Sequence, residues 1–127
     1  MIFFTNKINQ NILGGYSLAG LFSLWSSYQS SSFNAIVGAS PSVWFNGWEE
    51  FIDKSSPLSN VIYLSLGDKE EKTKNQTMAR VGKAIQKQEE LLNNRGIKTI
   101  LEWNNGGHFQ DSDIRLAKGF VWCIKNI

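Results

Sequence analysis

A serine that could act as a nucleophile lies in the run Gly-Tyr-Ser-Leu-Ala-Gly at residues 15–20. Ser17 has Gly15 and Ala19 two positions before and after it. Only small residues at those positions fit a turn sharp enough to expose a serine between a strand and a helix. A serine hydroxyl attacks a carbonyl carbon only when a neighbouring base removes its proton. The spacing therefore predicts a strained strand–turn–helix corner with Ser17 at its tip, and the simpler alternative is a serine that caps a helix.

The base and the acid that such a serine needs lie downstream. His108 is the chain's single histidine and follows Asn-Gly-Gly, a loop flexible enough to direct the ring back toward Ser17. Asp68, Glu70 and Glu71 lie between the two residues. Any of these acids could orient the imidazole and stabilise the imidazolium. The spacing alone does not separate them, and a Ser–His pair without a carboxylate is the fourth alternative.

The reaction would also require two hydrogen-bond donors for the oxyanion. We expect the backbone N–H of Leu18 to be one, because it follows the nucleophile at the start of a helix. The second donor normally comes from a loop after an earlier strand of the sheet. That strand would precede Met1, so we expect the second donor to come from outside this sequence.

Apolar runs and helical periodicity predict the elements that position these groups. Strands are predicted at residues 12–15, 33–39, 60–66 and 98–103, and helices at 17–28, 48–54, 77–94 and 112–127. The predicted apolar stripe of the first helix contains Leu18, Leu21, Phe22, Trp25 and Tyr28, and that of the third contains Met78, Val81, Ile85 and Leu92.

Strands that alternate with helices of this size predict an α/β fold with a mostly parallel four-stranded sheet flanked by helices. Ser17, the loop after Gly67 and His108 all follow the carboxyl end of a predicted strand. These ends share one edge of a parallel sheet, which is where ligands bind. We therefore expect the three segments to meet at one site.

Composition limits the class of protein. The 127 residues predict one domain, residues 1–127, and 42% hydrophobic and 13% aromatic residues are enough for a core. The net charge of +2 comes from scattered residues and argues against nucleic-acid binding. The single cysteine, Cys123, excludes an internal disulfide, and one histidine with one cysteine argues against a His/Cys zinc site. We expect no metal or cofactor. No apolar run approaches the ~20 residues of a membrane span, and the start lacks signal-peptide features, so we expect a cytoplasmic protein without membrane association.

Four segments in order resemble the esterase D-like and enterobactin-type siderophore esterases of the α/β-hydrolase superfamily. They are residues 15–22, residues 40–45 (Ser-Pro-Ser-Val-Trp-Phe), residues 64–70 (Leu-Ser-Leu-Gly-Asp-Lys-Glu) and residues 106–109 (Gly-Gly-His-Phe) followed by Arg115. The resemblance implies Ser17 as nucleophile and His108 as base, and it favours Glu70 as the acid. It also implies that Trp44 lies near the site, where a substrate contact and a core tryptophan are equally good interpretations. We further expect Tyr16, beside the nucleophile, to contact the substrate.

The chain departs from this family in two respects. It has Ala19 where the family usually has glycine, and alanine is small enough for the corner to form. The chain also resembles only the C-terminal half of such a domain, which makes residues 1–10 a remnant of the preceding helix and linker. Half a sheet exposes a strand edge and an apolar face, so we expect a homodimer or a contact with the missing N-terminal half.

Together these features predict a serine hydrolase that cleaves small carboxylic esters, siderophore-type esters among them, through a Ser–His–acid triad and an acyl-enzyme intermediate. The first alternative is a truncated, non-catalytic remnant, which the absent second oxyanion donor favours. The second is an interaction module of the same fold that uses the exposed edge.

Overall fold

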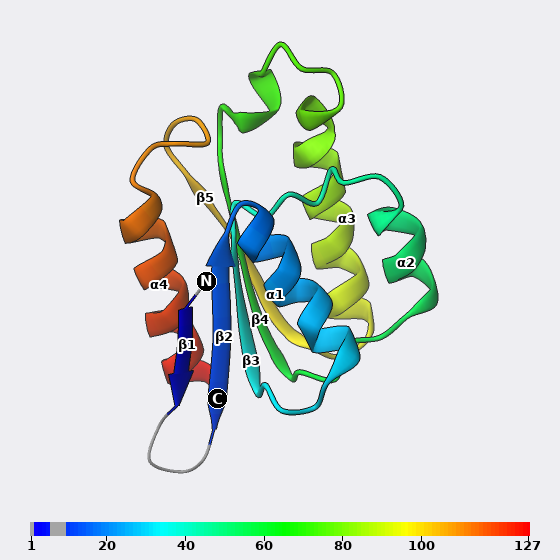
Figure 1. Cartoon of the computed structure of the whole chain (residues 1–127), viewed down its shortest axis with the longest axis vertical. Helices are drawn as coiled ribbons and strands as arrows, with labels where there is room; N and C mark the ends of the chain where they lie inside the picture. The colour runs from blue at the N-terminus through cyan, green and yellow to red at the C-terminus, as the bar shows by residue number, and fades with distance from the viewer. Residues whose placement is uncertain (1, 6–9) are drawn as a thin grey trace.

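The computed structural model describes residues 2–5 and 10–127, which form a five-stranded sheet with helices on both faces (Figure 1). The strands are β1 (Ile2–Thr5), β2 (Asn11–Tyr16), β3 (Ala35–Ala39), β4 (Val61–Gly67) and β5 (Lys98–Asn104), and they lie in that order across the sheet. β2 to β5 are parallel, and β1 is antiparallel to β2. The predicted α/β class with a mostly parallel sheet is confirmed.

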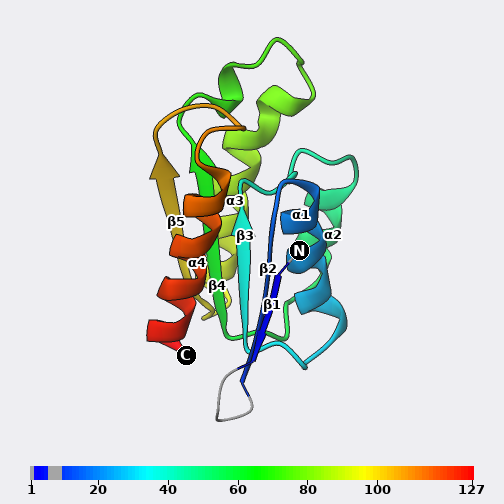
Figure 2. The same cartoon turned by 60° about the vertical axis from the view of Figure 1, so that its left-hand side comes forward.

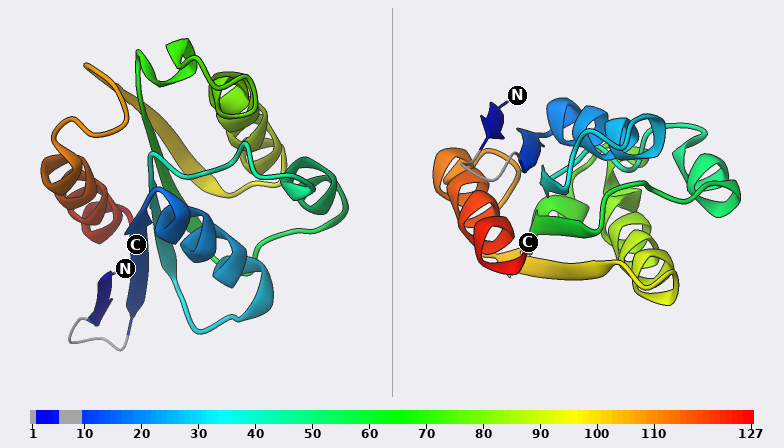
Figure 3. Two further views of the ribbon diagram at one scale, coloured as in Figure 1. Left: turned by 45° about the horizontal axis from the view of Figure 1, so that its top comes forward. Right: turned by 90° about the horizontal axis from the view of Figure 1, so that it is seen from below.

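The helices divide unequally between the two faces. They are α1 (Leu18–Gln29), α2 (Trp48–Lys54), α3 (Val81–Asn94) and α4 (Ser112–Asn126), with short 3-10 turns η1 (Glu70–Lys72) and η2 (Met78–Arg80). α1, α2 and α3 cover one face and α4 covers the other (Figure 3). Each parallel strand is added on the same side of the one before it, so right-handed crossovers place all three connecting helices on one face. α4 follows the last strand and covers the face that remains.

The core forms two layers because strand side chains alternate between faces. Ile36, Ile62 and Leu64 pack toward α1, α2 and α3, whereas Val37 and Tyr63 pack toward α4. All residues of β3 and β4 are buried. Burial on both faces explains why these two strands are continuous apolar runs in the sequence.

Residues 2–5, which were predicted to belong to a remnant of a helix and linker, form a strand instead. Ile2–Thr5 form β1, which pairs with β2 in a register that sets Phe3 opposite Leu13. An unpaired strand edge leaves backbone donors and acceptors without partners, and β1 satisfies those of β2. Met1 and residues 6–9 lie outside the described residues.

The predicted apolar stripe of α1 is wrong in part. Leu21 is buried, but Leu18, Phe22 and Trp25 are exposed. The helix buries Leu21 and Leu24 on the sheet side together with small side chains, among them Ser23, whose hydroxyl donates to the carbonyl of Ala19. Leu24 lies against Gly38 of β3.

The predicted stripe of the third helix is correct for its helical part. Val81, Ile85 and Leu92 of α3 are buried in the core. Met78 is exposed, because it belongs to the preceding 3-10 turn η2, which does not continue the face of α3. Within residues 2–5 and 10–127, no helix is both long enough and apolar enough to cross a membrane.

Candidate active site

Three side chains from distant parts of the chain meet at the carboxyl ends of β2 to β5, the upper edge of the sheet in Figures 1 and 2. Ser17 follows β2, Glu70 begins η1 after β4, and His108 lies in the loop after β5. The Nε2 atom of His108 is 2.9 Å from Ser17 Oγ. Its Nδ1 atom is 2.7 Å from Glu70 Oε1. The structure therefore links serine, histidine and carboxylate in one chain of hydrogen bonds.

Ser17 lies at the predicted strand–turn–helix corner. Its φ of 62° and ψ of −124° are a strained combination for a residue with a side chain. Its N–H donates to the Ala39 carbonyl over 3.1 Å, and its carbonyl accepts from the Ser42 N–H over 3.1 Å. A Cβ atom at Gly15 would lie 2.4 Å from the Ala19 carbonyl group, so only glycine fits there. The corner forms with Ala19 in place of the family's usual glycine.

The loop that carries His108 is held on both sides. Gly106 has a φ of 103°, which favours glycine, and its N–H donates to Asp68 Oδ1 over 2.9 Å. The Tyr16 hydroxyl donates to the His108 carbonyl over 2.5 Å. The two rings also pack together, with centroids 5.4 Å apart. These contacts fix the imidazole between Ser17 and Glu70.

Of the three candidate acids, Glu70 is the one that contacts His108. Glu70 is buried, whereas Asp68 and Glu71 are exposed. Asp68 accepts from the Gly106 N–H, and the Glu71 carboxylate lies against Gly82 of α3. The 3-10 turn η1 accounts for the difference, because it turns consecutive side chains in different directions.

The second oxygen of Glu70 is also fully engaged. Oε2 accepts hydrogen bonds from the Gly67 N–H over 2.7 Å and the Ser40 hydroxyl over 2.7 Å, and it lies 3.3 Å from an Arg115 guanidinium nitrogen. Burial by itself raises the pKa of the Glu70 carboxyl. Hydrogen bonds from His108, Gly67 and Ser40 outweigh burial and leave the pKa below its ordinary value. Glu70 is therefore ionised at neutral pH and favours the histidine tautomer with its proton on Nδ1.

Two residues of this network were not predicted as functional. Ser40 has a φ of 40° and directs its hydroxyl to Glu70, and Arg115 was indicated only as part of the resemblance. The Ser-Pro-Ser break directly after a predicted strand was a usable signal for Ser40. Arg115 is a single cation at the start of the last helix, and no local pattern distinguishes it.

The predicted oxyanion donor has a suitable position. Leu18 is the first residue of α1, and N–H groups in the first turn of a helix have no acceptor within that helix. On the side of β2 away from β3 lies the antiparallel β1. The carboxyl end of β1, at Thr5, pairs with Asn11, which is at the opposite end of β2 from Ser17. Among the described residues, no earlier parallel strand leads a loop to the Ser17 corner. The expected second donor has no counterpart there.

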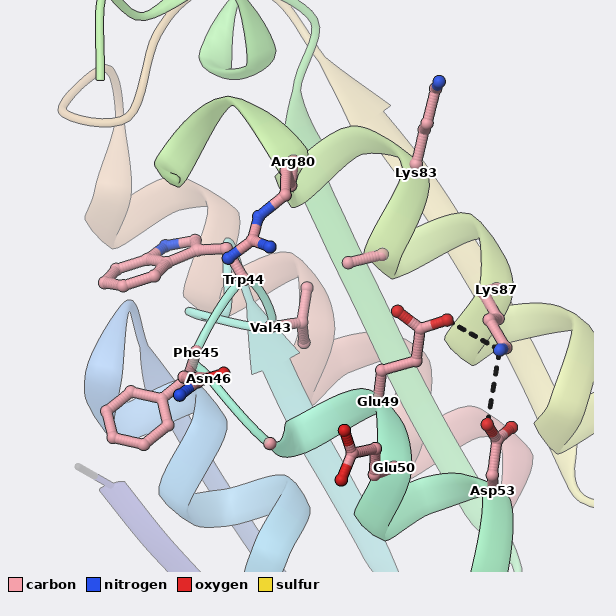
Figure 4. Close-up of a pocket in the computed structure, with 12 residues that line it drawn as sticks. Val43, Trp44, Phe45, Asn46, Glu49, Glu50, Asp53, Arg80, Lys83 and Lys87 are labelled. Carbon is pink, nitrogen blue, oxygen red and sulfur yellow. Dashed lines mark hydrogen bonds and ion pairs between the residues drawn. The ribbon is translucent and has the colours of Figure 1, made fainter. Parts of the chain in front are cut away.

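The two predicted substrate contacts differ in their surroundings. The Tyr16 hydroxyl donates to the His108 carbonyl and accepts from Arg115 over 3.0 Å, so it is already engaged. Trp44 is partly buried and lines a cavity of about 600 Å³ (Figure 4). Phe109, which was not predicted, is 92% exposed and meets the His108 ring edge-on at 5.1 Å. Substrate contact by Tyr16 or Trp44 stays a prediction.

The Trp44 cavity has an acidic and a basic side. Glu49 and Asp53 extend from α2 toward Lys87 of α3, which they bind at 2.7 and 3.4 Å, and Arg80 extends toward Trp44 (Figure 4). Ser17, Glu70 and His108 do not line this cavity. Neither here nor anywhere else in the described residues do three His, Cys, Asp or Glu side chains gather where they could hold a metal ion.

Solved structures with this fold are esterases and hydrolases. The enterobactin esterase FES from Shigella flexneri superposes with a TM-score of 0.72 at 18% identity, over 91% of this chain and 31% of its own. The siderophore hydrolase EstA from Aspergillus nidulans superposes with a TM-score of 0.63 at 23% identity, over 90% of this chain and 47% of its own. Esterase PE8 superposes with a TM-score of 0.59 at 17% identity, over 91% of this chain and 50% of its own.

The predicted resemblance to these esterases is confirmed at the level of the fold. No protein-family model matches the sequence, and no curated protein matches it either. The chain spans between about a third and a half of the length of the solved structures described above. The fold is thus shared with part of each of these proteins.

Proposed function

We propose that this chain carries the nucleophile, base and acid of a serine hydrolase that acts on carboxylic esters. Ser17 is the nucleophile, His108 the general base and Glu70 the acid. The observation that carries the proposal is the continuous chain from Ser17 Oγ through both nitrogens of His108 to Glu70. The fold shared with siderophore esterases supports the same class of reaction and suggests siderophore-type esters as substrates.

The reaction proceeds in two halves. Ser17 Oγ forms a bond to the ester carbonyl carbon while its proton passes to His108 Nε2. The bond from that carbon to the alcohol oxygen then breaks, and His108 returns the proton to the leaving alcohol. Water next attacks the acyl-enzyme with His108 again as base, which releases the carboxylic acid and restores the Ser17 hydroxyl. Glu70 stays ionised and stabilises the imidazolium in both halves.

The oxyanion of each tetrahedral intermediate would accept a hydrogen bond from the Leu18 N–H. The helix dipole of α1 favours negative charge at the same point. Loss of one of two oxyanion donors costs on the order of 10²–10³ in rate. We therefore expect slow hydrolysis by this chain alone and faster hydrolysis when a partner supplies the second donor.

The test is covalent labelling with a fluorophosphonate, followed by intact mass measurement and peptide mapping. The reagent needs no knowledge of the substrate, because it reacts with an activated serine. We expect one label, on Ser17, and none in the Ser17→Ala and His108→Ala variants. A folded wild-type chain that stays unlabelled would contradict the proposal.

A non-catalytic function is the second candidate. It is favoured by the share of the solved esterases that the chain spans, 31% to 50%, and by the absence of a second oxyanion donor among the described residues. In that case the chain is a remnant or an interaction module of the same fold. Ester turnover that disappears in Ser17→Ala would exclude this candidate.

A further inference from the structure

Arg115, on the first turn of α4, is the largest of the fully buried side chains in the described structure. Its guanidinium contacts one group at or just after the carboxyl end of each of the four parallel strands. These are the Tyr16 hydroxyl at 3.0 Å, the Ser40 hydroxyl at 3.4 Å, Glu70 Oε2 at 3.3 Å and the Asn105 carbonyl at 2.8 Å. A single buried cation thus connects all the loops that form the candidate site.

We infer that Arg115 is a positioning residue, which holds His108 in the reactive geometry through two separate branches. The inference rests on the proposed function, since it assigns Arg115 a role in the same site. In the first branch, Arg115 binds Glu70 Oε2, and the other oxygen of Glu70 binds His108 Nδ1. In the second, Arg115 donates to the Tyr16 hydroxyl, which donates to the His108 carbonyl.

The two branches constrain different parts of His108. The Glu70 branch fixes the rotation and the tautomer of the ring, and the Tyr16 branch fixes the backbone that carries it. Because Arg115 begins both branches, its loss would release both constraints together. Both branches start at Nη1 of the guanidinium, while Nη2 donates to the Asn105 carbonyl. The planar group holds these donors in one fixed arrangement, whereas a lysine ammonium provides the same charge from a single nitrogen on a flexible chain.

Stability alone is a poor explanation for this arginine. Burial of a charge is costly, and replacement of a buried ion pair by apolar residues is often neutral or stabilising. In the described structure the Nε atom of Arg115 is buried and has no hydrogen-bond partner, which adds to the cost. An unfavourable position of this kind is typical of a residue retained for a site.

The charged and titratable groups around His108 are few. Glu70 binds its ring from η1, and Asp68 binds the Gly106 N–H of its loop. Tyr16 binds its carbonyl from β2, and Arg115 binds both Glu70 and Tyr16 from α4. Asp111 lies on its own loop and is exposed. Arg115 is the one cation of this set, so its removal makes the surroundings of the imidazole more negative and favours the protonated ring.

The experiment uses the fact that the chain has one histidine. We would titrate its NMR signals, with nitrogen shifts to report the tautomer, in the wild type and in Arg115→Met, Arg115→Lys and Tyr16→Phe. Arg115→Met should move the midpoint of the titration up by about one pH unit and mix the two tautomers. Arg115→Lys should leave the midpoint at its wild-type value but should still mix the two tautomers. Tyr16→Phe should leave the midpoint at its wild-type value.

Steady-state kinetics on a neutral activated ester give the second measurement. Arg115→Met should lower kcat at least tenfold with KM within twofold, because substrate binding is not affected. Arg115→Lys should recover part of the loss, and Tyr16→Phe should lower kcat less than Arg115→Met does. Lys118→Met is the matched control, since Lys118 lies one turn further along α4, is exposed and binds Glu102 at 3.2 Å. It should change neither the titration nor kcat.

Two results would overturn the inference. One is an unchanged midpoint and tautomer in folded Arg115→Met. The other result decides the matter if Arg115→Met does not fold. It is a wild-type tautomer together with a wild-type kcat in both Arg115→Lys and Tyr16→Phe. The titration does not require turnover, so failure of the proposed function, seen as unlabelled wild-type Ser17, is distinguished from failure of the role of Arg115.

Discussion

Of the three neighbouring acids, only one contacts the proposed base. Glu70 contacts His108, whereas Asp68 contacts the loop backbone and Glu71 lies against α3. The carboxylate that we propose as the acid is the one that the 3-10 turn η1 directs inward. This difference can be measured separately for each residue.

Glu70→Gln should lower kcat by on the order of 10³–10⁴, because an amide favours the wrong histidine tautomer. Glu71→Gln, the matched control in the same turn, should leave kcat within twofold. Asp68→Asn should have an intermediate effect through the loop. Kinetics on an activated ester check all three, and a Glu71→Gln loss equal to that of Glu70→Gln would contradict Glu70 as the acid.

The lowered pKa of Glu70 also makes stability depend on pH. A carboxyl whose pKa is lower in the folded than in the unfolded chain stabilises the fold above the unfolded value, which is close to 4.5. That contribution disappears as the pH falls through the folded value. We expect the free energy of unfolding of the wild type, measured by urea denaturation, to fall below about pH 5. Glu70→Gln should flatten this dependence, and an equally steep curve in the variant would contradict it.

At the scale of elements, close packing of helices on the sheet depends on particular glycines. Gly119 of α4 faces the sheet, where an added Cβ would lie 2.3 Å from Val37 and 2.8 Å from Tyr63. Both neighbours are buried and cannot move away. Gly82 of α3 differs, because its nearest neighbour at 1.9 Å is the end of the exposed and flexible Glu71 side chain.

Gly119→Ala should therefore destabilise the fold by about 1–3 kcal/mol through overpacking, despite the better helix propensity of alanine. Gly82→Ala, the matched helical control, should be neutral or stabilise it by up to about 1 kcal/mol. Urea unfolding of both variants measures the difference. Equal effects of the two substitutions would show that the contact of α4 with β3 and β4 is looser than the structure indicates.

At the scale of the whole molecule, exposed apolar side chains remain on both faces. α1 exposes Leu18, Phe22 and Trp25, and the rings of the last two are 5.8 Å apart. On the other face, Val121 and Trp122 of α4 line an open groove of about 480 Å³ beside β5. Exposed apolar groups of this kind favour association with another protein surface.

We predict that the chain associates in solution, either with itself or with a separately supplied N-terminal half. Sedimentation at micromolar concentration should show a dimer, and Trp25→Ser should weaken it. Lys74→Met, an exposed position in the loop between η1 and η2, serves as the surface control. A compact wild-type monomer would contradict self-association and leave the supplied half as the partner to test.

The sequence by itself determined the four parallel strands, the helices that follow them and the α/β class. Apolar runs of β3 and β4 and the periodicity of α3 are local patterns, and parallel strands joined by helices have one favoured handedness. The strained corner at Ser17 is local too, because it requires small residues at fixed positions. For these reasons the amino-acid pattern alone was enough to place Ser17 and His108 at one edge of the sheet.

Only the tertiary structure decided which groups are in contact. The choice of Glu70 over Asp68 depends on how η1 turns, and the contacts of Arg115 depend on α4 folding back across loops that are distant in sequence. The exposed face of α1 and the strand β1 likewise reflect packing against neighbours, not local pattern. Contacts between remote segments have no periodic signal in a sequence, because they follow from the shape of the whole fold.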